Sequence, residues 1–340
     1  AFFLEAIALG VFLYGRGRVS DRVHLLSGLV VGIAGVFSGI FVVAANGWMN
    51  SPAGFDWVNG QAINIDPFKA MFNKAWFHEA LHMTVAAFVS TCFAVAGIHA
   101  YLLMRHKGNE FHRKAIRIAM AFGAVSAILQ PLTGDFAAKR VAELQPTKLA
   151  AMESLFKTSK PASLIIGGIP NEEEETVSYG IHIPKALSYL AHGDFNAEVE
   201  GLDKTPKENR PPVVIVHIAF QVMVLLGTLM MFAGILYLVF QFKWKENLEK
   251  RWWLKTLVWL TPAGFIAVDA GWIVTEVGRQ PWIIYGIMKT KDAVSPMPGL
   301  QFSLYIVTLL YLALTFIVFW LMKRQITVIN DNPQILYDHD

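Results

Sequence analysis

The sequence predicts an all-α protein whose helices cross a membrane several times, and composition and segment length are the observations behind this prediction. Of the 340 residues, 54% are hydrophobic and only 16% are charged, whereas soluble proteins carry about 25% charged residues. The mean hydropathy is +0.43. The apolar residues gather into long runs, and most runs reach the roughly 20 residues that a helix needs to cross a bilayer. We therefore expect a polytopic transmembrane helical bundle.

Seven apolar segments are predicted to be membrane spans, and the first of them is short. This first segment opens the chain in the middle of an apolar run and without a methionine, so we expect an N-terminal portion to be missing. The segments cover residues 1–14, 24–48, 79–104, 114–134, 212–241, 252–275 and 300–322.

The links between the segments alternate between basic links and neutral or acidic ones. Residues 15–23 carry three arginines against one acid, residues 105–117 carry five Lys or Arg against one acid, and residues 242–255 carry five against two. Lys323 and Arg324 follow the last segment. Because basic links stay on the cytoplasmic side, these links and the C-terminus are predicted to lie inside. The remaining links are then external: 49–78, 135–211 and 276–299.

The chain is predicted to have three parts: transmembrane helices over residues 1–134, an external loop over 135–211, and further transmembrane helices over 212–340. The loop contains prolines, short amphipathic pieces and an acidic run, so we expect an ordered lobe near the membrane surface. The single cysteine, Cys92, excludes an internal disulfide and a cysteine-based metal cluster. The net charge of +3 gives no reason to expect a nucleic-acid partner.

The stretch AGWIVTEVGRQPW at residues 270–282 places Glu276 and Arg279 at the end of an apolar run. Gly278 and Pro281 are expected to end the helix there. A carboxylate in or near the membrane core is costly unless it is paired, so Glu276 is a candidate functional residue. The alternative is a helix end whose polar side chains reach the lipid headgroups.

The sequence HEALH, which begins at His78, is a literal HExxH motif. On a helix, His78 and His82 share one face, which is the geometry that binds zinc in metalloproteases, with Glu79 as the general base. An intramembrane zinc metalloprotease is therefore one hypothesis. It requires a third ligand, and Asp269 or Glu276 could supply it.

A second interpretation of the same helix uses only His82, which lies about one turn inside the membrane. Small residues follow it along the helix and leave room for a flat macrocycle or for a neighbouring helix. Met223 lies in the middle of another span. A His and a Met from two facing helices form a low-spin haem site that suits electron transfer. The alternative for Met223 is ordinary packing, since the chain has 12 methionines.

Further polar residues lie within or at the ends of the predicted spans. Intramembrane carboxylates often mark proton relays, so these residues together predict a proton path. Each of them could instead form a hydrogen bond between two helices. They are Glu5, Ser38, Asn46, Asp135 and Asp269.

Five separated motifs together resemble subunit I of the cytochrome bd-type quinol oxidases, over essentially the whole chain. The most specific is GWxxxExGRQPW at residues 271–282, which matches in full. The stretch QPTKLAAME at 145–153 resembles the start of that family's external quinol loop. The other motifs are AFFLE at 1–5, VAANGWMNSP at 43–52 and FQVMVLLG at 220–227.

The resemblance implies a set of haem-binding residues. His82 and Met223 match the axial ligands of a low-spin haem b, and Glu276 matches the carboxylate ligand of a high-spin haem b. Arg279 would then pair with haem propionates, and Trp272 would lie between haems as an electron bridge. The resemblance also implies a third haem, haem d, at which oxygen is reduced.

The resemblance further implies residues for substrate and protons. Lys148 and Glu153 match loop residues that are implicated in quinol oxidation. Glu5, Ser38 and Asn46 match positions for proton delivery towards the oxygen-reducing haem. The implied reaction is quinol oxidation at the outer face and oxygen reduction with protons from inside, which generates proton motive force. The implied setting is a bacterial or archaeal cytoplasmic membrane, with a second subunit, a small single-span subunit and lipid as partners.

Three features depart from the family pattern. The family has nine spans and AFFLE belongs to its third, so the missing portion is expected to be two spans that include the His ligand of haem d. Some members carry an Arg near the low-spin haem where this chain has Gln221. The external loop lacks the long insertion of some members, which makes it the short-loop variety. A non-catalytic membrane protein that only relays electrons is a further hypothesis, and under the oxidase hypothesis His78 and Glu79 have no role.

Overall fold

The structure is a computed structural model that describes residues 1–105 and 109–331. Helices dominate these residues, and the strands within them form only two-stranded pairs. The predicted all-α class is therefore confirmed. The longer helices are α1 (Phe2–Tyr14), α2 (Asp21–Asn50), α4 (Trp76–Arg105), α5 (Glu110–Leu144), α8 (Val213–Phe242), α9 (Arg251–Leu260), α10 (Ala263–Val277) and α11 (Leu300–Asp331).

Every segment that was predicted to span the membrane is helical. Among the described residues, six helical segments are long and apolar enough to cross a membrane, with α9 and α10 taken together as Arg251–Val277. The first predicted span, α1, is apolar but shorter. Large hydrophobic side chains such as Leu29, Phe122 and Leu225 are exposed on these helices, as expected where a helix faces lipid.

Helix α5 extends beyond the predicted span 114–134 at both ends. The predicted span ends at residue 134 and the external loop begins at 135, but the helix continues to Leu144. Ion pairs one turn apart stabilise the extension: Lys139 lies 2.7 Å from Asp135, and Arg140 lies 2.6 Å from Glu143. Because hydropathy reports only the lipid-facing part, it misses helix that continues into water.

The predicted span 252–275 is divided into α9 and α10, and Pro262 stands at the division. Proline lacks an N–H and clashes with the preceding turn, which explains the break. The neighbouring Thr261 packs against Gly97 of α4. The break therefore determines the direction of α10 after the contact between Thr261 and Gly97.

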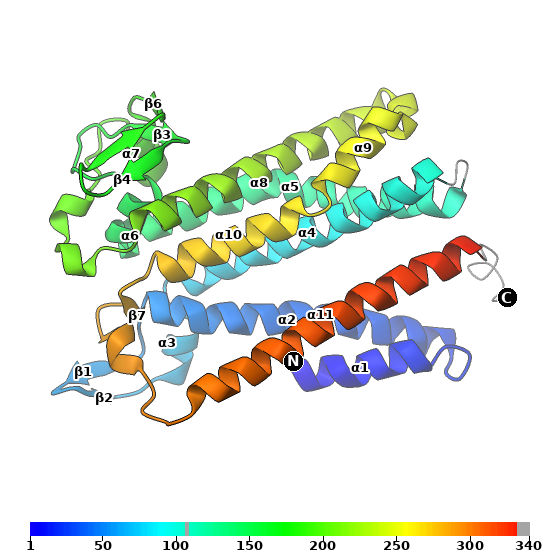
Figure 1. Cartoon of the computed structure of the whole chain (residues 1–340), viewed down its shortest axis with the longest axis horizontal. Coiled ribbons are helices and arrows are strands. Elements are labelled where there is room, and N and C mark those ends of the chain that lie inside the picture. The colour runs from blue at the N-terminus through cyan, green and yellow to red at the C-terminus, as the bar shows by residue number, and fades with distance from the viewer. Residues whose placement is uncertain (106–108, 332–340) are drawn as a thin grey trace. The chain divides into compact units, whose positions relative to one another are not determined.

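Residues 1–293 form one compact unit, and α4 lies at its centre. Helix α4 packs against α2, α5, α9 and α10, and α8 packs against α5 and α10. Figure 1 shows α4, α5, α8 and α10 running side by side. The fully buried core between them includes Phe93 of α4, Met120 of α5, and Trp253 and Leu257 of α9. Helix α1 packs against α2.

Residues 294–340 form a second unit, which contains α11. Its stretch Leu300–Arg324 is long and apolar enough to cross a membrane. The guanidinium of Arg324 lies 5.8 Å from the ring centroid of Trp320, one turn earlier on the helix.

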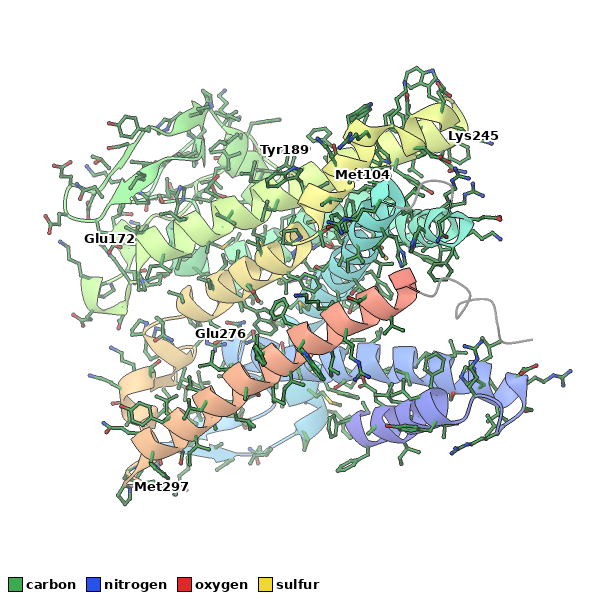
Figure 2. The ribbon with its side chains drawn as sticks, turned by 45° about the vertical axis from the view of Figure 1, so that its right-hand side comes forward. Met104, Glu172, Tyr189, Lys245, Glu276 and Met297 are labelled. Atoms are coloured by element: carbon green, nitrogen blue, oxygen red, sulfur yellow. The ribbon has the colours of Figure 1, made fainter. Side chains whose placement is uncertain are left out.

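The link between α5 and α8 folds into a small lobe at one end of the first unit (Figure 1). Its core includes Leu187, Val199 and Leu202, and it packs against Val216 of α8. The link before α9, which contains Lys245, lies at the opposite end from Glu172 of the lobe (Figure 2). The lobe contains α6 (Pro146–Met152), β3 (Leu164–Ile166), β4 (Ile169–Asn171), β5 (Thr176–Ser178), β6 (Ile181–Ile183), α7 (Ala186–His192), η1 (Leu202–Lys204) and η2 (Lys207–Asn209).

Within the lobe, β3 pairs antiparallel with β6, and β4 pairs antiparallel with β5. Two further antiparallel pairs, β1–β2 and β7–β8, lie in other links of the first unit. The remaining short elements are β1 (Asp56–Val58), β2 (Gln61–Ile63), α3 (Pro67–Met71), η3 (Lys245–Glu249), β7 (Trp282–Ile284), β8 (Met288–Lys289) and η4 (Thr290–Ala293).

Gly97 allows α4 and α9 to approach closely, and this predicts the effect of a substitution. A Cβ atom at Gly97 would lie 2.6 Å from the backbone oxygen of Leu257. Gly97→Ala is therefore expected to destabilise the bundle by about 1–3 kcal/mol and to lower the midpoint of thermal unfolding in detergent. Gly32→Ala on α2 is the control, because a Cβ there meets no atom within 4 Å. Equal midpoints for the two variants would contradict this account of the packing.

Candidate functional site

Polar side chains gather where α10 ends beside α2, and Glu276 and Arg279 are the centre of this group. Arg279 donates to Glu276 over 2.6 Å, and the amide of Asn46 donates to the other carboxylate oxygen. The side chain of Arg279 is only 2% exposed, whereas that of Glu276 is 42% exposed. Figure 2 labels Glu276 at the end of α10. Glu276 is thus held by two donors and keeps an open side.

Helix α10 ends at Val277, one residue after Glu276, and Arg279 lies in the turn that follows. Gly278 follows the last helical residue, and a Cβ atom there would lie 3.1 Å from Cγ of Lys148. Glycine at this position therefore lets the lobe approach the end of α10. As a result, Lys148 and Arg279 reach the same buried amide, that of Asn50.

Asn50, the last residue of α2, joins side chains from three other parts of the chain. Its amide oxygen accepts from Nζ of Lys148 over 2.9 Å and from Arg279 over 3.3 Å. Its amide nitrogen donates to Asn46 over 2.9 Å and to Glu79 over 3.2 Å. Sequence reasoning assigned Asn50 no role. The available signal was its position one turn after Asn46, which places both amides on one helix face.

Lys148 and Glu153 lie on and just after α6, and both are buried, with exposed fractions of 3% and 4%. Burial is the main reason that the pKa of Lys148 falls to about 7. Burial likewise raises the pKa of Glu153 to about 8. The Oε2 atom of Glu153 has no hydrogen-bond partner. Both groups can therefore exchange protons close to neutral pH.

His82 on α4 faces α5, and its ring orientation follows from its neighbours. The hydroxyl of Thr133 donates to the backbone oxygen of Gln130 over 2.9 Å, so it accepts from Nδ1 of His82 at 3.1 Å. In this tautomer Nε2 carries the lone pair and accepts from the Gln130 amide at 3.2 Å, so a metal at Nε2 would take the place of that hydrogen bond. The Gln130 amide nitrogen lies 3.2 Å from both ring nitrogens. A Cβ at Gly134 would lie 3.3 Å from the ring, so glycine lets the ring pack closely against α5.

Met223 on α8 faces α10 across a second glycine. A Cβ atom at Gly271 would lie 3.2 Å from the Met223 sulfur. Helix α10 packs against both α8 and α4, the helices that carry Met223 and His82. The residues present fit haem by their donor set, because an imidazole and a thioether on two helices that both pack against α10 can each bind a haem iron. Trp272, one turn before Glu276 on α10, is half-buried.

Gln221 is engaged with the lobe. Its amide oxygen accepts from the backbone N–H of Gly167 over 3.0 Å, and its amide nitrogen donates to the carbonyl of Ile165 over 3.1 Å. Both ends of the amide therefore tie the β3–β4 turn to α8. This contact explains why a neutral amide suits the position, although the sequence suggested only an effect on charge near the haem.

The predicted proton-path residues lie on α1 and α2. A carboxylate oxygen of Glu5 lies 3.6 Å from the position of a Cβ at Gly35, so Glu5 faces α2 one turn before Ser38. Asn46 lies further along α2 and contacts Glu276. Asp269, in contrast, is exposed on α10, and Asp135 pairs with Lys139.

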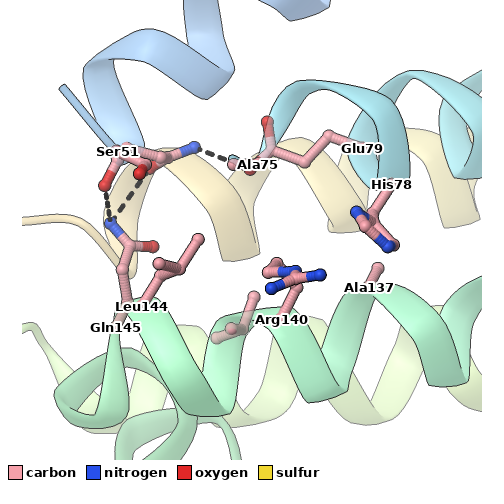
Figure 3. A pocket seen from close by; sticks show the side chains of 10 residues that line it. Ser51, Ala75, His78, Glu79, Ala137, Arg140, Leu144 and Gln145 are labelled. Carbon is pink, nitrogen blue, oxygen red and sulfur yellow. Dashed lines mark hydrogen bonds between the residues drawn. The ribbon is translucent and has the colours of Figure 1, made fainter. Parts of the chain in front are cut away.

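The HExxH motif lies at the start of α4, where Glu79 contacts Asn50. A cavity of about 20 Å³ lies beside His78 and Glu79, and Arg140 and Gln145 also line it (Figure 3). The His78 Nδ1 and Glu79 Oε2 atoms have no hydrogen-bond partner. Over residues 1–105 and 109–331, no three His, Cys, Asp or Glu side chains come together as a metal site. The described fold thus does not provide the third zinc ligand that the metalloprotease hypothesis requires.

A polytopic helical bundle that carries a half-buried His, a Met and a paired carboxylate has the donor set of the haem-binding membrane oxidoreductases. The whole-chain comparison then identifies the family. The family model of cytochrome bd terminal oxidase subunit I matches residues 1–329, and the chain belongs to that family.

Relatives and a solved structure agree with this assignment. Cytochrome bd ubiquinol oxidase subunit 1 of Bacillus subtilis is 32% identical, over 96% of this chain and 72% of the relative. Cytochrome bd-II ubiquinol oxidase subunit 1 of Escherichia coli is 27% identical, over 95% and 76%. The structure of bd oxidase from Geobacillus thermodenitrificans matches with a TM-score of 0.88 and 38% identity, over 96% of this chain and 75% of that chain.

The raised pKa of Glu153 predicts a pH-dependent stability. Below its ordinary pKa of about 4.3, Glu153 is protonated in both states. As the pH rises towards the folded value of about 8, the unfolded state loses its proton first, so stability falls. Glu153→Gln should remove this decline. The unfolding midpoint of the variant minus that of the wild type should therefore increase between pH 5 and 8. The solvent-exposed Glu174 provides the control variant, Glu174→Gln, which should keep the wild-type slope.

Proposed function

We propose that this chain is the quinol-oxidising, haem-binding subunit of an electrogenic quinol:oxygen oxidoreductase. Membership of the family supports the quinol oxidase role. When bound, a low-spin haem b, a high-spin haem b and haem d supply the chemistry by carrying electrons from quinol to oxygen. The observation that carries the proposal is the continuous set of hydrogen bonds from Lys148 through Asn50 to Arg279 and Glu276.

Quinol is proposed to bind at the lobe, beside Lys148 and Glu153. A quinol hydroxyl has to lose a proton as it is oxidised, and these buried groups have pKa values of about 7 and about 8. A general base works best when its pKa lies near the working pH. Lys148 and Glu153 are therefore suited to accept protons from the two hydroxyls, while Gln221 holds the nearby turn of the lobe on α8.

The haem-holding roles follow from the contacts of each side chain. His82 presents Nε2 because Thr133 accepts from Nδ1, and Met223 would be its partner at the low-spin haem b. Glu276 would bind the high-spin haem b through its exposed side. Arg279 donates to the Glu276 carboxylate and would offer further N–H groups to propionates, and the half-buried Trp272 would lie between the haems.

Protons for oxygen reduction are proposed to enter from the cytoplasmic side along Glu5, Ser38 and Asn46. The position of Glu5 against α2, and the contact of Asn46 with Glu276, support this direction. The lobe would lie outside and the basic links and C-terminus inside, in a bacterial or archaeal cytoplasmic membrane. The proposed partners are subunit II, a small single-span subunit and membrane lipid.

A reduced-minus-oxidised spectrum of the purified oxidase, with and without carbon monoxide, tests the function. We expect bands of low-spin and high-spin haem b and a red-shifted chlorin band of haem d that changes with carbon monoxide. Quinol-dependent oxygen consumption should accompany them. A b-haem spectrum without oxygen consumption would support an electron relay instead, and zinc without haem would support the protease.

Met223→Leu is expected to remove the low-spin haem b signal, because leucine fills similar volume but offers no sulfur to the iron. Met230→Leu on the same helix is the matched control, since Met230 lies in the packed core of the bundle. The control should keep the full spectrum. Persistence of the low-spin signal in Met223→Leu would show that the ligand assignment is wrong.

A further inference from the structure

We propose that Asn50 is a positioning residue for quinol oxidation, which orients the amino group of Lys148 and joins it to the Arg279–Glu276 pair. The inference rests on the proposed function for its catalytic meaning. Its physical basis is the hydrogen-bonded contact of Asn50 with the lobe and with the end of α10. The motif VAANGWMNSP contains this residue, but the resemblance implied no role for it.

The neighbours of Asn50 fix the orientation of its amide. Lys148 and Arg279 can only donate, and they lie 2.9 Å and 3.3 Å from the amide oxygen. Gln145 donates to the backbone oxygen of Asn50 over 2.9 Å and lies 3.4 Å from its amide oxygen. A flipped amide would point N–H groups at two cations. The oxygen therefore faces Lys148 in the stable arrangement.

The amide nitrogen of Asn50 also has hydrogen-bond partners. Its nitrogen lies 2.9 Å from the amide oxygen of Asn46, 3.2 Å from Glu79 Oε1 and 3.3 Å from the Thr275 hydroxyl. These contacts come from α2, α4 and α10. With Asn50 only 2% exposed, the amide cannot exchange these partners for bulk water. Its position is therefore fixed by three helices while it receives Lys148 from the lobe.

Lys148 depends on this contact because it is buried. An ammonium group without an acceptor is costly in a low-dielectric site, so burial favours its neutral form. The carboxylates of Glu79 and Glu276 counteract burial by favouring the charged form, whereas Arg279 opposes it. The amide oxygen of Asn50, at 2.9 Å, adds a direct acceptor for the ammonium group. Replacing that oxygen with a carboxylate or with a methyl group should therefore shift the proton affinity of Lys148 in opposite directions.

The same amide also reaches the small cavity beside α5. Glu79 accepts from Asn50 through Oε1, whereas its Oε2 has no hydrogen-bond partner. Glu79 is also one of the residues that line the cavity (Figure 3). A volume of about 20 Å³ is sufficient for one water molecule. Asn50 is therefore shared between a buried amine and a carboxylate beside a water-sized space. This arrangement is suited to hold Lys148 where a proton can be taken up and released.

The test compares Asn50→Asp with Asn50→Leu in the complete, haem-loaded oxidase. The carboxylate should raise the proton affinity of Lys148 and move the inflection of the pH profile of quinol oxidation upwards by about 1 unit or more. The leucine removes the acceptor and should move the inflection downwards. A purely structural role would lower activity in both variants and leave the inflection in place, which would overturn the proposal.

A second readout does not depend on activity. The thermal unfolding midpoint in detergent, measured against pH, should begin to rise at the folded pKa of Lys148, because above it only the unfolded state keeps that proton, and this onset should show the same opposite shifts. If the wild type fails to oxidise quinol but these shifts occur, the proposed function fails while the positioning of Lys148 stands. If the wild type oxidises quinol and neither readout shifts, the Asn50 proposal alone is wrong.

Asn73→Asp and Asn73→Leu are the matched controls. Asn73 is another buried asparagine near the start of α4, but its hydrogen bonds go to the backbone of Ala44, Ala70, Met71, Ala75 and Trp76. These variants should leave the inflection and the onset in place, even where stability falls. Should Asn50→Leu fail to assemble, Asn50→Ser replaces it, because its shorter side chain withdraws the oxygen from Lys148 and should give the same downward shift.

Discussion

The ion pair of Arg279 with Glu276 is the interaction on which the proposed site depends. A guanidinium that is 2% exposed needs a carboxylate within reach, and the 2.6 Å contact provides it. The same pair fixes the carboxylate at the end of α10, with its second oxygen held by Asn46. Removing either partner would leave a charge without compensation. The positions of the neighbouring side chains follow from this requirement.

The rest of the bundle serves to bring that pair, the lobe and the helix ends together. Pro262 interrupts the last span of the first unit, so α10 follows its own direction after the contact of α9 with α4. Gly278 then admits Lys148 beside the end of α10. Two small backbone features therefore determine which side chains meet, and neither of them is itself a functional group.

Hydropathy and periodicity predict the helices well because each helix satisfies its own backbone hydrogen bonds in lipid. They fail at the end of α5, where ion pairs replace apolar residues, and at the division around Pro262. The individual site residues were recognisable only through the family motifs. Asn50 was missed because its meaning lies in contacts with Lys148 and Arg279, which are distant in the sequence. A local pattern contains no record of such contacts.

Gln221 is a second residue whose contacts are with residues that are distant in the sequence. Family members that carry an Arg at this place lead to the prediction of a different charge near the low-spin haem, and the structure adds that both ends of the Gln221 amide bind the turn of the lobe. The neighbour that determines the residue type is more than fifty positions away.

The buried ionisable groups of the site are stabilised in two different ways, and the difference matches their proposed tasks. Arg279 stays charged because it is paired, which suits a group that has to hold a carboxylate and haem propionates. Lys148 and Glu153 are shifted by burial to pKa values of about 7 and about 8, so a small change in surroundings alters their protonation. A fixed charge holds a cofactor in place, whereas a shifted one exchanges protons with a substrate. Asn50 contacts both Lys148 and Arg279. It therefore holds Lys148, which exchanges a proton, at a constant position relative to Arg279, which keeps its charge.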